Sequence, residues 1–451
     1  MQRSLAFENS PPLLAPLPFF LNVPLFAALA ALLLLWEGPQ ALVSRWSPLA
    51  LALTHLFTLG VLTSAMTGAL IQILPVATGV HIPNARTNAG IVHALLTLGT
   101  LALAAAFMLS AGWIYRLALT LLAAAFAWFI IVCIAGFWQC RRTASTRAAE
   151  VLLAVRLGLA ALFVTVVLGV TLAGGLGWGL SRPFALLPFG SLVDLHGLWG
   201  LAGWVGLVIA GIAYQVMPIF QVTELYPRRF TQWFAPGVFV LLVLWSVVAF
   251  VPGSPHAANR AVAALVALGY VALSVTTFHL LWTRKRRKAD TTTLFWRCAM
   301  VSLSCCVLVW FAQWVGGVRD FSVTLGVLFV VGVALSAING MLYKIIPFLL
   351  WYNAEKTLEL TIRIVPKVQN IIPDSTAAKQ FWAHLAALVL LVAASFWPVP
   401  FTRVAAVALA ISVGWLGRNM FNAIRLYRRV RRQIDEIQAD PARANEVMDL
   451  P

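Results

Sequence analysis

Residues 54–79 read THLFTLGVLTSAMTGALIQILPVATG, an apolar stretch long enough to cross a membrane. A histidine stands near its start, and Gly68, Gln72 and Pro75 stand toward its end. The same G-x3-[QK]-x2-P spacing returns as GIAYQVMP at 211–218 and as GMLYKIIP at 340–347. Three copies separated by comparable lengths of chain predict three related units of roughly four helices each.

The composition excludes an ordinary soluble protein. The chain has 451 residues, of which 61% are hydrophobic and only 10% are charged. The net charge of +17 would point to nucleic acid in a soluble protein, but here the cations cluster in short loops and indicate membrane topology. We therefore expect a lipid bilayer around the chain and no nucleic-acid partner. The five cysteines form no C-x-x-C pair, which favours buried thiols over disulfides or metal ligands.

Windows of about 20 apolar residues, the length that crosses a hydrocarbon core, recur along nearly the whole chain. Because separate spans in lipid satisfy their backbone groups only as helices, we predict an all-α polytopic membrane protein with twelve transmembrane helices. The predicted helices are 18–36, 49–75, 89–111, 114–138, 150–176, 191–219, 232–251, 258–282, 294–316, 323–350, 378–398 and 403–427. They form a single transmembrane domain over 1–451, with repeat units at 18–138, 150–282 and 294–427 and a basic tail at 428–451.

Lys and Arg concentrate at the N-terminus, in the even-numbered loops and in the C-terminal tail. Examples are Arg141 and Arg142, the run from Arg284 to Lys288, and the arginines of the tail. Short cytoplasmic loops carry this positive excess, so both termini are predicted to be cytoplasmic, in a bacterial-type inner (plasma) membrane. The first residues show no cleavable signal pattern. The longest loop, 351–377, includes a β-like stretch at 358–368 and has no readable function.

Ionisable groups inside a membrane are candidates for function. His55 and His196 lie in the outer parts of two of the three repeat helices. As structural residues they would need only a backbone or hydroxyl partner, whereas as ligands they would present neutral imidazoles to a metal or haem iron. His93, His279 and His384 lie near predicted cytoplasmic helix ends, where an imidazole can reach the interface, and His93 is the weaker ligand candidate.

Other polar residues lie on or beside the repeat helices. Asp194, two residues before His196, could orient that imidazole or could face water. Gln72, Gln215 and Lys344 occupy the same place in the three repeats and could line a path through the protein. For Lys344, extension of the side chain to the membrane interface is an adequate alternative.

The first repeat helix resembles a known family. A helix with a histidine, then Gly68 thirteen residues later, Gln72 at seventeen and Pro75 at twenty resembles the tenth helix of haem–copper oxidase subunit I, particularly its C-type branch. The resemblance implies a twelve-helix fold with cytoplasmic termini and pseudo-threefold symmetry, in which helices 2, 6 and 10 are the repeat helices. The chain also resembles the NnrS family, a twelve-helix haem- and copper-containing relative, although the short motifs match less well.

The departures from that family concern its metal ligands. The oxidases carry a His-x-His on helix 10 that serves both haems, but residues 325–327 here contain no histidine. They carry adjacent copper-ligand histidines around helix 7, but residues 232–251 contain none. The resemblance therefore implies the scaffold without an oxygen-reducing centre. We do not expect copper, and we do not expect an oxygen reductase.

The resemblance also places the two outer histidines relative to each other. His55 lies 20 residues before its repeat proline and His196 lies 22 before its own, so at 100° per residue they leave opposite sides of equivalent helices. In the oxidases, a haem lies between two repeat helices with one ligand at each kind of offset. Applying the pseudo-threefold places His55 and His196 across the third pore, which holds no haem in the oxidases. Small residues nearby could make room for a porphyrin or could serve helix packing: Gly60, Gly197 and Gly200.

Our leading hypothesis is one haem, of b type, bound by His55 and His196. The chain would then transfer electrons, or sense or handle a small diatomic gas, with a cytochrome or quinol as redox partner. Electron transfer suits a bis-histidine haem better, because its iron has no open coordination position. Two alternatives stand beside this hypothesis. One is a twelve-helix permease for a small solute or metal, and the other is a non-catalytic assembly partner of a respiratory complex.

Overall fold

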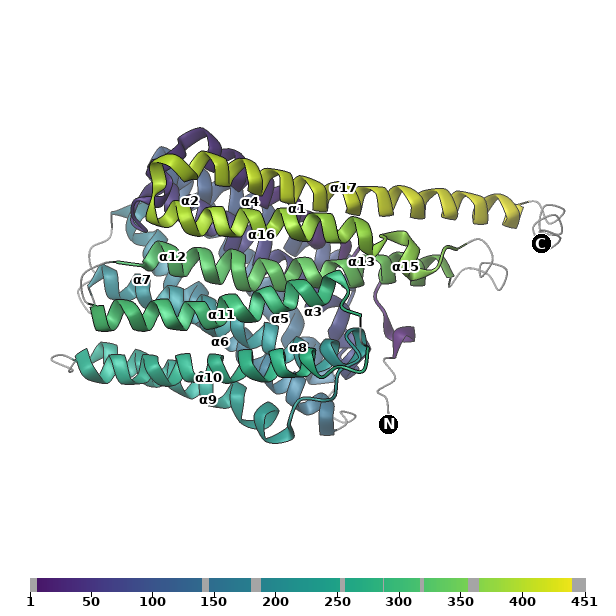
Figure 1. Cartoon of the computed structure of the whole chain (residues 1–451), viewed down its shortest axis with the longest axis horizontal. Helices are drawn as coiled ribbons and strands as arrows, with labels where there is room; N and C mark the ends of the chain where they lie inside the picture. The colour runs from purple at the N-terminus through teal and green to yellow at the C-terminus, as the bar shows by residue number, and fades with distance from the viewer. Residues whose placement is uncertain are drawn as a thin grey trace.

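The computed structural model describes residues 6–139, 146–179, 188–251, 256–286, 288–316, 320–355 and 365–439. All regular secondary structure within these ranges is helical, and 12 helices are long and apolar enough to cross a membrane. They form one elongated bundle in which both termini lie at the same end (Figure 1). The prediction of an all-α protein with twelve spans is confirmed.

Nine of the spans are each formed mainly by one helix. These are α1 (Leu17–Glu37), α4 (Ala85–Leu109), α5 (Gly112–Gln139), α6 (Thr146–Trp178), α9 (Arg228–Phe250), α10 (His256–Trp282), α11 (Thr291–Gly316), α16 (Asp374–Phe396) and α17 (Pro398–Ala439). Four short helices lie outside or at the ends of spans: η1 (Phe7–Asn9), η2 (Gly38–Leu42), η4 (Leu74–Thr78) and α15 (Val368–Ile371).

The three repeat helices are divided, because each contains a π-helical segment. The second span runs through α2 (Pro48–His55), η3 (Leu56–Thr63) and α3 (Ser64–Ile73), and continues into η4. The sixth runs through α7 (Phe189–Leu198), η6 (Trp199–Val205) and α8 (Gly206–Phe220). The tenth runs through α12 (Ser322–Val327), η7 (Leu328–Leu335) and α13 (Ser336–Glu355).

These π segments hold the same place in each unit. Each begins 19 residues before the repeat proline: Leu56 before Pro75, Trp199 before Pro218 and Leu328 before Pro347. A π segment is rare and widens the helix locally, and such segments are frequent at functional sites. Three of them at one offset support the division into three related units.

Each signature glycine is a point of close approach between two helices. A Cβ at Gly68, Gly211 or Gly340 would lie 2.9, 2.7 or 2.8 Å from a Cβ atom of the first helix of the same unit. A second glycine stands eight residues earlier in every unit, as Gly60, Gly203 and Gly332, and these also pack against that first helix. The repeat is therefore G-x7-G-x3-[QK]-x2-P, and its glycines let helix backbones pack closely in the membrane.

The expected β-like stretch at 358–368 falls largely outside the described residues, which resume at Val365. From Val365 to Lys367 the chain is irregular, and Val368 already begins α15. The predicted tail begins at residue 428, but α17 continues unbroken to Ala439, so the first part of this tail belongs to the last helix. The helix extends past the rest of the bundle (Figure 1).

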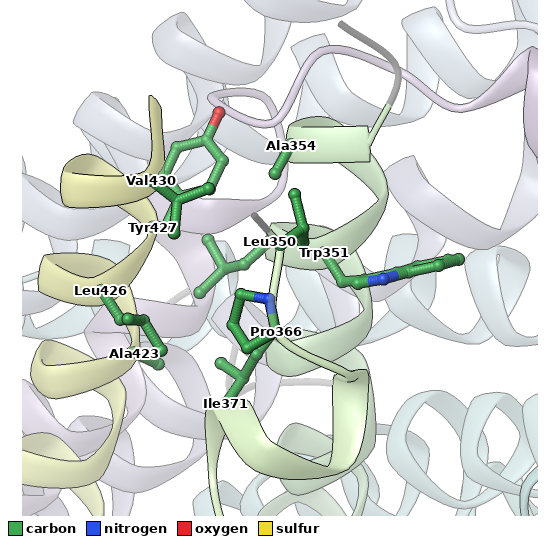
Figure 2. A pocket seen from close by; sticks show the side chains of 10 residues that line it. Leu350, Trp351, Ala354, Pro366, Ile371, Ala423, Leu426, Tyr427 and Val430 are labelled. Carbon is green, nitrogen blue, oxygen red and sulfur yellow. The ribbon is translucent and has the colours of Figure 1, made fainter. Parts of the chain in front are cut away.

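The extension of α17 is anchored by an apolar contact with α13 and with the chain before α15. Figure 2 shows the hollow between them, which is lined by Leu350, Trp351, Ala354, Val365, Pro366, Ile371, Ala423, Leu426, Tyr427 and Val430. Its volume of about 10 Å³ is no larger than one water molecule requires. We interpret this hollow as a packing gap rather than a ligand site.

A buried polar network joins the second and third units near the end of the bundle that carries the termini. Lys344 Nζ lies 2.8 Å from Asp290 Oδ2, and Asp290 Oδ1 accepts from the backbone N–H of Thr293 at 2.9 Å and lies 2.8 Å from the hydroxyl oxygen of the same residue. Arg284 donates to Thr293 Oγ1 at 2.6 Å, and Gln221 accepts from the same hydroxyl group at 2.6 Å. Lys344 is thus held by a carboxylate rather than extended alone to the interface.

Candidate functional site

A cavity of about 270 Å³ lies between the first and second units. Its walls come from the outer part of the second span (α2 and η3), from α4, α5 and α6, and from the outer part of the sixth span (α7 and η6). His55 and His196 both line it. The structure thus brings the two histidines of the leading hypothesis to one cavity. The helices that carry them, α2 and α7, lie at the end of the bundle opposite the termini (Figure 1).

The two imidazole rings lie close to each other across this cavity. Their centroids are 6.3 Å apart and their planes are inclined by 21°. Phe107 of α4 lies beside His55, with ring centroids 5.1 Å apart. His55 is the last residue of α2 and His196 stands near the end of α7, so each imidazole is placed directly before a π segment.

Hydrogen bonds fix which nitrogen of each ring faces the cavity. Nδ1 of His55 lies 2.8 Å from the backbone oxygen of Leu51, and Nδ1 of His196 lies 3.0 Å from that of Thr165. A carbonyl oxygen only accepts, so in the neutral imidazole Nδ1 carries the proton and Nε2 keeps a lone pair. No described residue is hydrogen-bonded to either Nε2. Metal-binding histidines share this arrangement, in which the second ring nitrogen donates to a carbonyl.

Apart from the histidines, the cavity wall is apolar or already hydrogen-bonded. The hydroxyls of Thr54, Thr58 and Thr165 each donate to a backbone carbonyl one turn earlier, at 2.7–2.8 Å. Trp204 of η6 donates to Thr63 of η3 at 3.1 Å, which joins the two π segments beside the cavity. Leucine, valine and phenylalanine side chains make up most of the rest. The two Nε2 atoms are therefore the lone pairs that the site offers to a ligand.

Small residues make room around His196. A Cβ at Gly169 of α6 would lie 3.0 Å from Cε1 of the His196 ring, so the ring packs directly on this glycine. Gly197 and Gly200 also line the cavity, and nothing lies within 4 Å of a Cβ built at Gly197. Gly60 does not serve this purpose. It faces Phe26 of α1 and is a helix-packing glycine, because a Cβ there would lie only 2.3 Å from the Phe26 ring.

The mouth of the cavity lies at the end of the bundle opposite the termini. Trp46, Leu176 and Phe189 line the cavity and are also exposed, by 43%, 45% and 39%. The rings of Trp46 and Phe189 lie 6.5 Å apart. Arg45 stacks 4.4 Å over the Trp46 ring and forms a 2.7 Å ion pair with Asp194. Asp194 therefore ties α7 to the chain before α2 and does not orient His196, which Thr165 does instead.

The other candidate residues lie away from this cavity. Gln72 donates to Ser10 at 2.6 Å, Lys344 pairs with Asp290, and Gln215 is buried in α8. None of the three is among the lining residues, and so they do not form a path with the histidines. His93 lies 3.3 Å from the side-chain oxygen of Asn22 and is also outside the cavity wall.

His384 differs from its expected position near an interface. Its side chain is 0% exposed, and its Nε2 lies 2.8 Å from the hydroxyl of Ser336, the first residue after η7. Its Nδ1 has no hydrogen-bond partner among the described residues. Ser64 occupies the position of Ser336 in the first unit and contacts Asn22 at 3.3 Å, next to His93. Hydropathy alone did not indicate this burial, because α16 carries its polar residues on the face that packs inward.

The donor set fits a haem iron. Two iron–imidazole bonds of roughly 2 Å separate the two nitrogens by about 4 Å, and the two half-rings bring the centroid separation to about 6 Å. The observed 6.3 Å agrees with this value. The cavity of about 270 Å³ lies just below the roughly 300–1,000 Å³ of cofactor pockets. Entry of a tetrapyrrole therefore requires side chains at the mouth, such as Trp46 and Phe189, to move outward.

A third protein ligand for a small metal ion is not evident. In the described ranges, no group of three or more His, Cys, Asp or Glu side chains could hold a metal ion. Two contributors to the site are not indicated by the sequence. Thr165 holds His196 through a backbone carbonyl, which any residue has, and Gly169 lies outside the repeat motif. The second repeat glycine could have been found by aligning the three units.

No protein-family model matches the chain, and no curated protein matches it either.

Proposed function

We propose that this chain is a haem-binding membrane protein that transfers electrons through one haem held by His55 and His196. One observation carries the proposal. Two imidazoles 6.3 Å apart line one cavity, and each has its Nδ1 committed to a backbone carbonyl. When bound, a haem iron with two imidazole ligands supplies one-electron chemistry and has no open position for oxygen. The proposal therefore does not include oxygen reduction, and it favours electron transfer over the handling of a diatomic gas.

The protein's own residues perform three tasks in this proposal. The carbonyls of Leu51 and Thr165 hold the imidazoles in one tautomer, so that both Nε2 atoms stay available. The apolar wall keeps water away from the iron and favours a low-charge state of the site. The threonine hydroxyls of the wall donate to their own helices, so they do not compete for the metal.

The scaffold and location belong to the same proposal. Twelve spans, three π-containing repeat helices and close-packed repeat glycines support a haem–copper oxidase subunit I-like arrangement. The distribution of Lys and Arg supports an inner membrane with cytoplasmic termini. Reporter fusions after Lys288 and Pro451 should both report cytoplasm, and a periplasmic signal at either position would reverse this orientation. A cytochrome or quinol would exchange electrons with the site.

An absorption and electron paramagnetic resonance study of the purified protein tests the function. The wild type, expressed with sufficient haem, should show a Soret band and the signature of a low-spin iron with two imidazole ligands. His55→Ala and His196→Ala should each lose the low-spin signature, because one axial ligand is missing. His93→Ala is the matched control, since it removes an intramembrane histidine outside the cavity wall and should leave the spectrum unchanged.

Two results would overturn the proposal. The first is a folded wild-type protein that takes up no haem after reconstitution. The second is a low-spin spectrum that survives removal of either histidine. Copper found in place of a tetrapyrrole would assign the cavity to a metal ion instead.

The permease alternative gains no support from the described residues, because Gln72, Gln215 and Lys344 do not line the cavity. An assembly partner without a cofactor would show no Soret band.

A further inference from the structure

The cavity mouth has a charge pattern that its apolar wall does not explain. The outer end of the bundle is poor in cations, and its arginines in the described residues are Arg45, Arg116, Arg260 and Arg403. Two of the four flank the mouth. Arg45 stacks on Trp46, which lines the cavity, and pairs with Asp194, which neighbours the lining residue Val193.

Arg116 lies near the mouth on α5. It stands one turn before the lining residue Leu119 on α5. Its Cγ lies 3.2 Å from a Cβ built at Gly177, the residue after the exposed lining residue Leu176. Its side chain is exposed, and among the described residues no carboxylate pairs with it.

Neither guanidinium is committed to a buried partner. Arg45 gives Nη1 to Asp194, and these side chains are 38% and 56% exposed, so that their ion pair is weak. A guanidinium carries five N–H donors in a planar fork that matches a carboxylate, so Arg45 can keep Asp194 and still bind a second anion. The site thus combines an apolar interior, two imidazole nitrogens and two guanidinium groups at the entrance.

We infer that Arg45 and Arg116 bind the two carboxylates of a dicarboxylic tetrapyrrole and hold its acidic edge at the outer mouth. The inference rests on the proposed function, since it names the orientation and chemical class of the ligand of the same cavity. An acidic edge in the apolar interior would be strongly disfavoured, whereas at the mouth it meets two cations and water. Arg45 and Arg116 are positioning residues and are not ligands of the iron.

The test compares two probes on the haem-free protein in detergent: ferric protoporphyrin IX and its dimethyl ester, which lacks the two negative charges. The wild type should bind the free acid about tenfold or more tightly than the ester, as expected when charge-assisted hydrogen bonds are lost. In the double variant R45Q/R116Q this preference should fall to about one, and the midpoint potential should decrease because two cations are gone. R260Q is the matched control, because Arg260 is an exposed arginine at the same end on α10, which does not line the cavity.

The outcomes separate this inference from the proposed function. Equal binding of both probes by the wild type, or an unchanged preference in R45Q/R116Q, overturns the role of the two arginines and leaves the haem site standing. Binding of neither probe by the wild type overturns the haem site, and the inference with it. Binding of the ester by the double variant shows that the histidine site is intact, so that a loss of preference is not a folding defect.

Discussion

The cavity of His55 and His196 and the network around Asp290 are both polar regions at a boundary between repeat units, and they use polar atoms in opposite ways. In the cavity, each imidazole commits one nitrogen to the backbone and leaves the other facing a space of about 270 Å³. In the network, the Asp290 carboxylate accepts from Lys344 and from the backbone N–H of Thr293, and its side chain is 9% exposed.

This difference distinguishes buried polar groups with a structural role from those available to a ligand. The carboxylate of Asp290 is surrounded by its own partners, so this region holds the second and third units together. The lone pairs at the cavity face open space, and in the proposed function this space takes up a ligand that the chain does not supply. Burial is common to both regions. The direction of the uncommitted atoms distinguishes a binding site from a structural bridge.

If the two regions have different roles, a variant in each should change a different measurement. His55→Leu should abolish the low-spin haem spectrum and leave the melting temperature of the haem-free protein nearly unchanged. Asp290→Asn should keep the spectrum and destabilise the fold by about 2 kcal/mol, since it leaves Lys344 without its charged partner. The measurements are absorption spectra and tryptophan-fluorescence melting in detergent. A stable Asp290→Asn protein without haem would show that the two regions are coupled.

A smaller effect is expected at Gly169, where the His196 ring packs against the backbone of α6. A Cβ at this position would already lie 3.0 Å from Cε1 of the His196 ring, so the larger side chain of valine should displace the ring. The haem affinity should then fall by roughly tenfold, a change of about 1.4 kcal/mol. Titration of haem into the haem-free protein measures this change. Gly326→Ala is the control, because a Cβ there meets nothing within 4 Å and α12 lies in the third unit. An unaltered affinity in Gly169→Val would contradict the packing described for His196.

The pH dependence of stability sharpens the description of the network. Burial raises the pKa of Asp290, but the charge of Lys344 and the hydrogen bonds from Lys344 and Thr293 outweigh it, so that the pKa lies below its ordinary value. The stabilisation by the carboxylate is therefore present above the ordinary carboxyl pKa of about 4 and is lost as the pH falls through the lower folded-state value. The melting-temperature difference between wild type and Asp290→Asn should be constant from about pH 8 to 5 and should shrink below about pH 4. A difference that grows on acidification would mean that Asp290 is protonated in the native protein.

The smallest effect should come from His384→Leu, at a buried histidine that does not line the cavity. Because its Nδ1 already lacks a partner, His384→Leu removes a buried polar group and should change the stability by less than about 1 kcal/mol. His384→Ala should cost about 2–4 kcal/mol, since it leaves a void in a fully buried position. Neither variant should alter the haem spectrum. A lost spectrum in His384→Leu would extend the site into the third unit.

Much of the fold follows from the sequence, because each span is a long apolar window and its length is set by the bilayer. The helix edges agree to within a few residues, except at α17. There the apolar residues Ile424, Tyr427, Val430, Ile434 and Ile437, spaced three or four apart, prolong the helix as an amphipathic one. The sequence does not predict which polar residues of different helices contact each other. Lys344 and Asp290 are 54 residues apart, and no local pattern connects them.

The histidine pair was predictable for a specific reason. The direction of each histidine was predicted from the number of residues between it and its repeat proline, at 100° per residue. A π segment has more residues per turn, so it changes the angle that a given number of residues spans. Both histidines precede their π segment, so the disturbance is nearly the same in both helices and cancels from their relative direction. Gly60 lies inside η3 and packs on Phe26, so of the two roles that the sequence left open for it, helix packing is the one that the structure shows.

The three π segments also record the history of the chain. A widened turn at one fixed offset in all three units is what successive duplications leave when the ancestral four-helix segment already contained it. The histidines do not share this regularity, since they stand at different offsets in the first two units and Leu325 and Val327 occupy those offsets in the third. The deformation of the helix is thus common to all three units, whereas an imidazole at either offset occurs in only two of them.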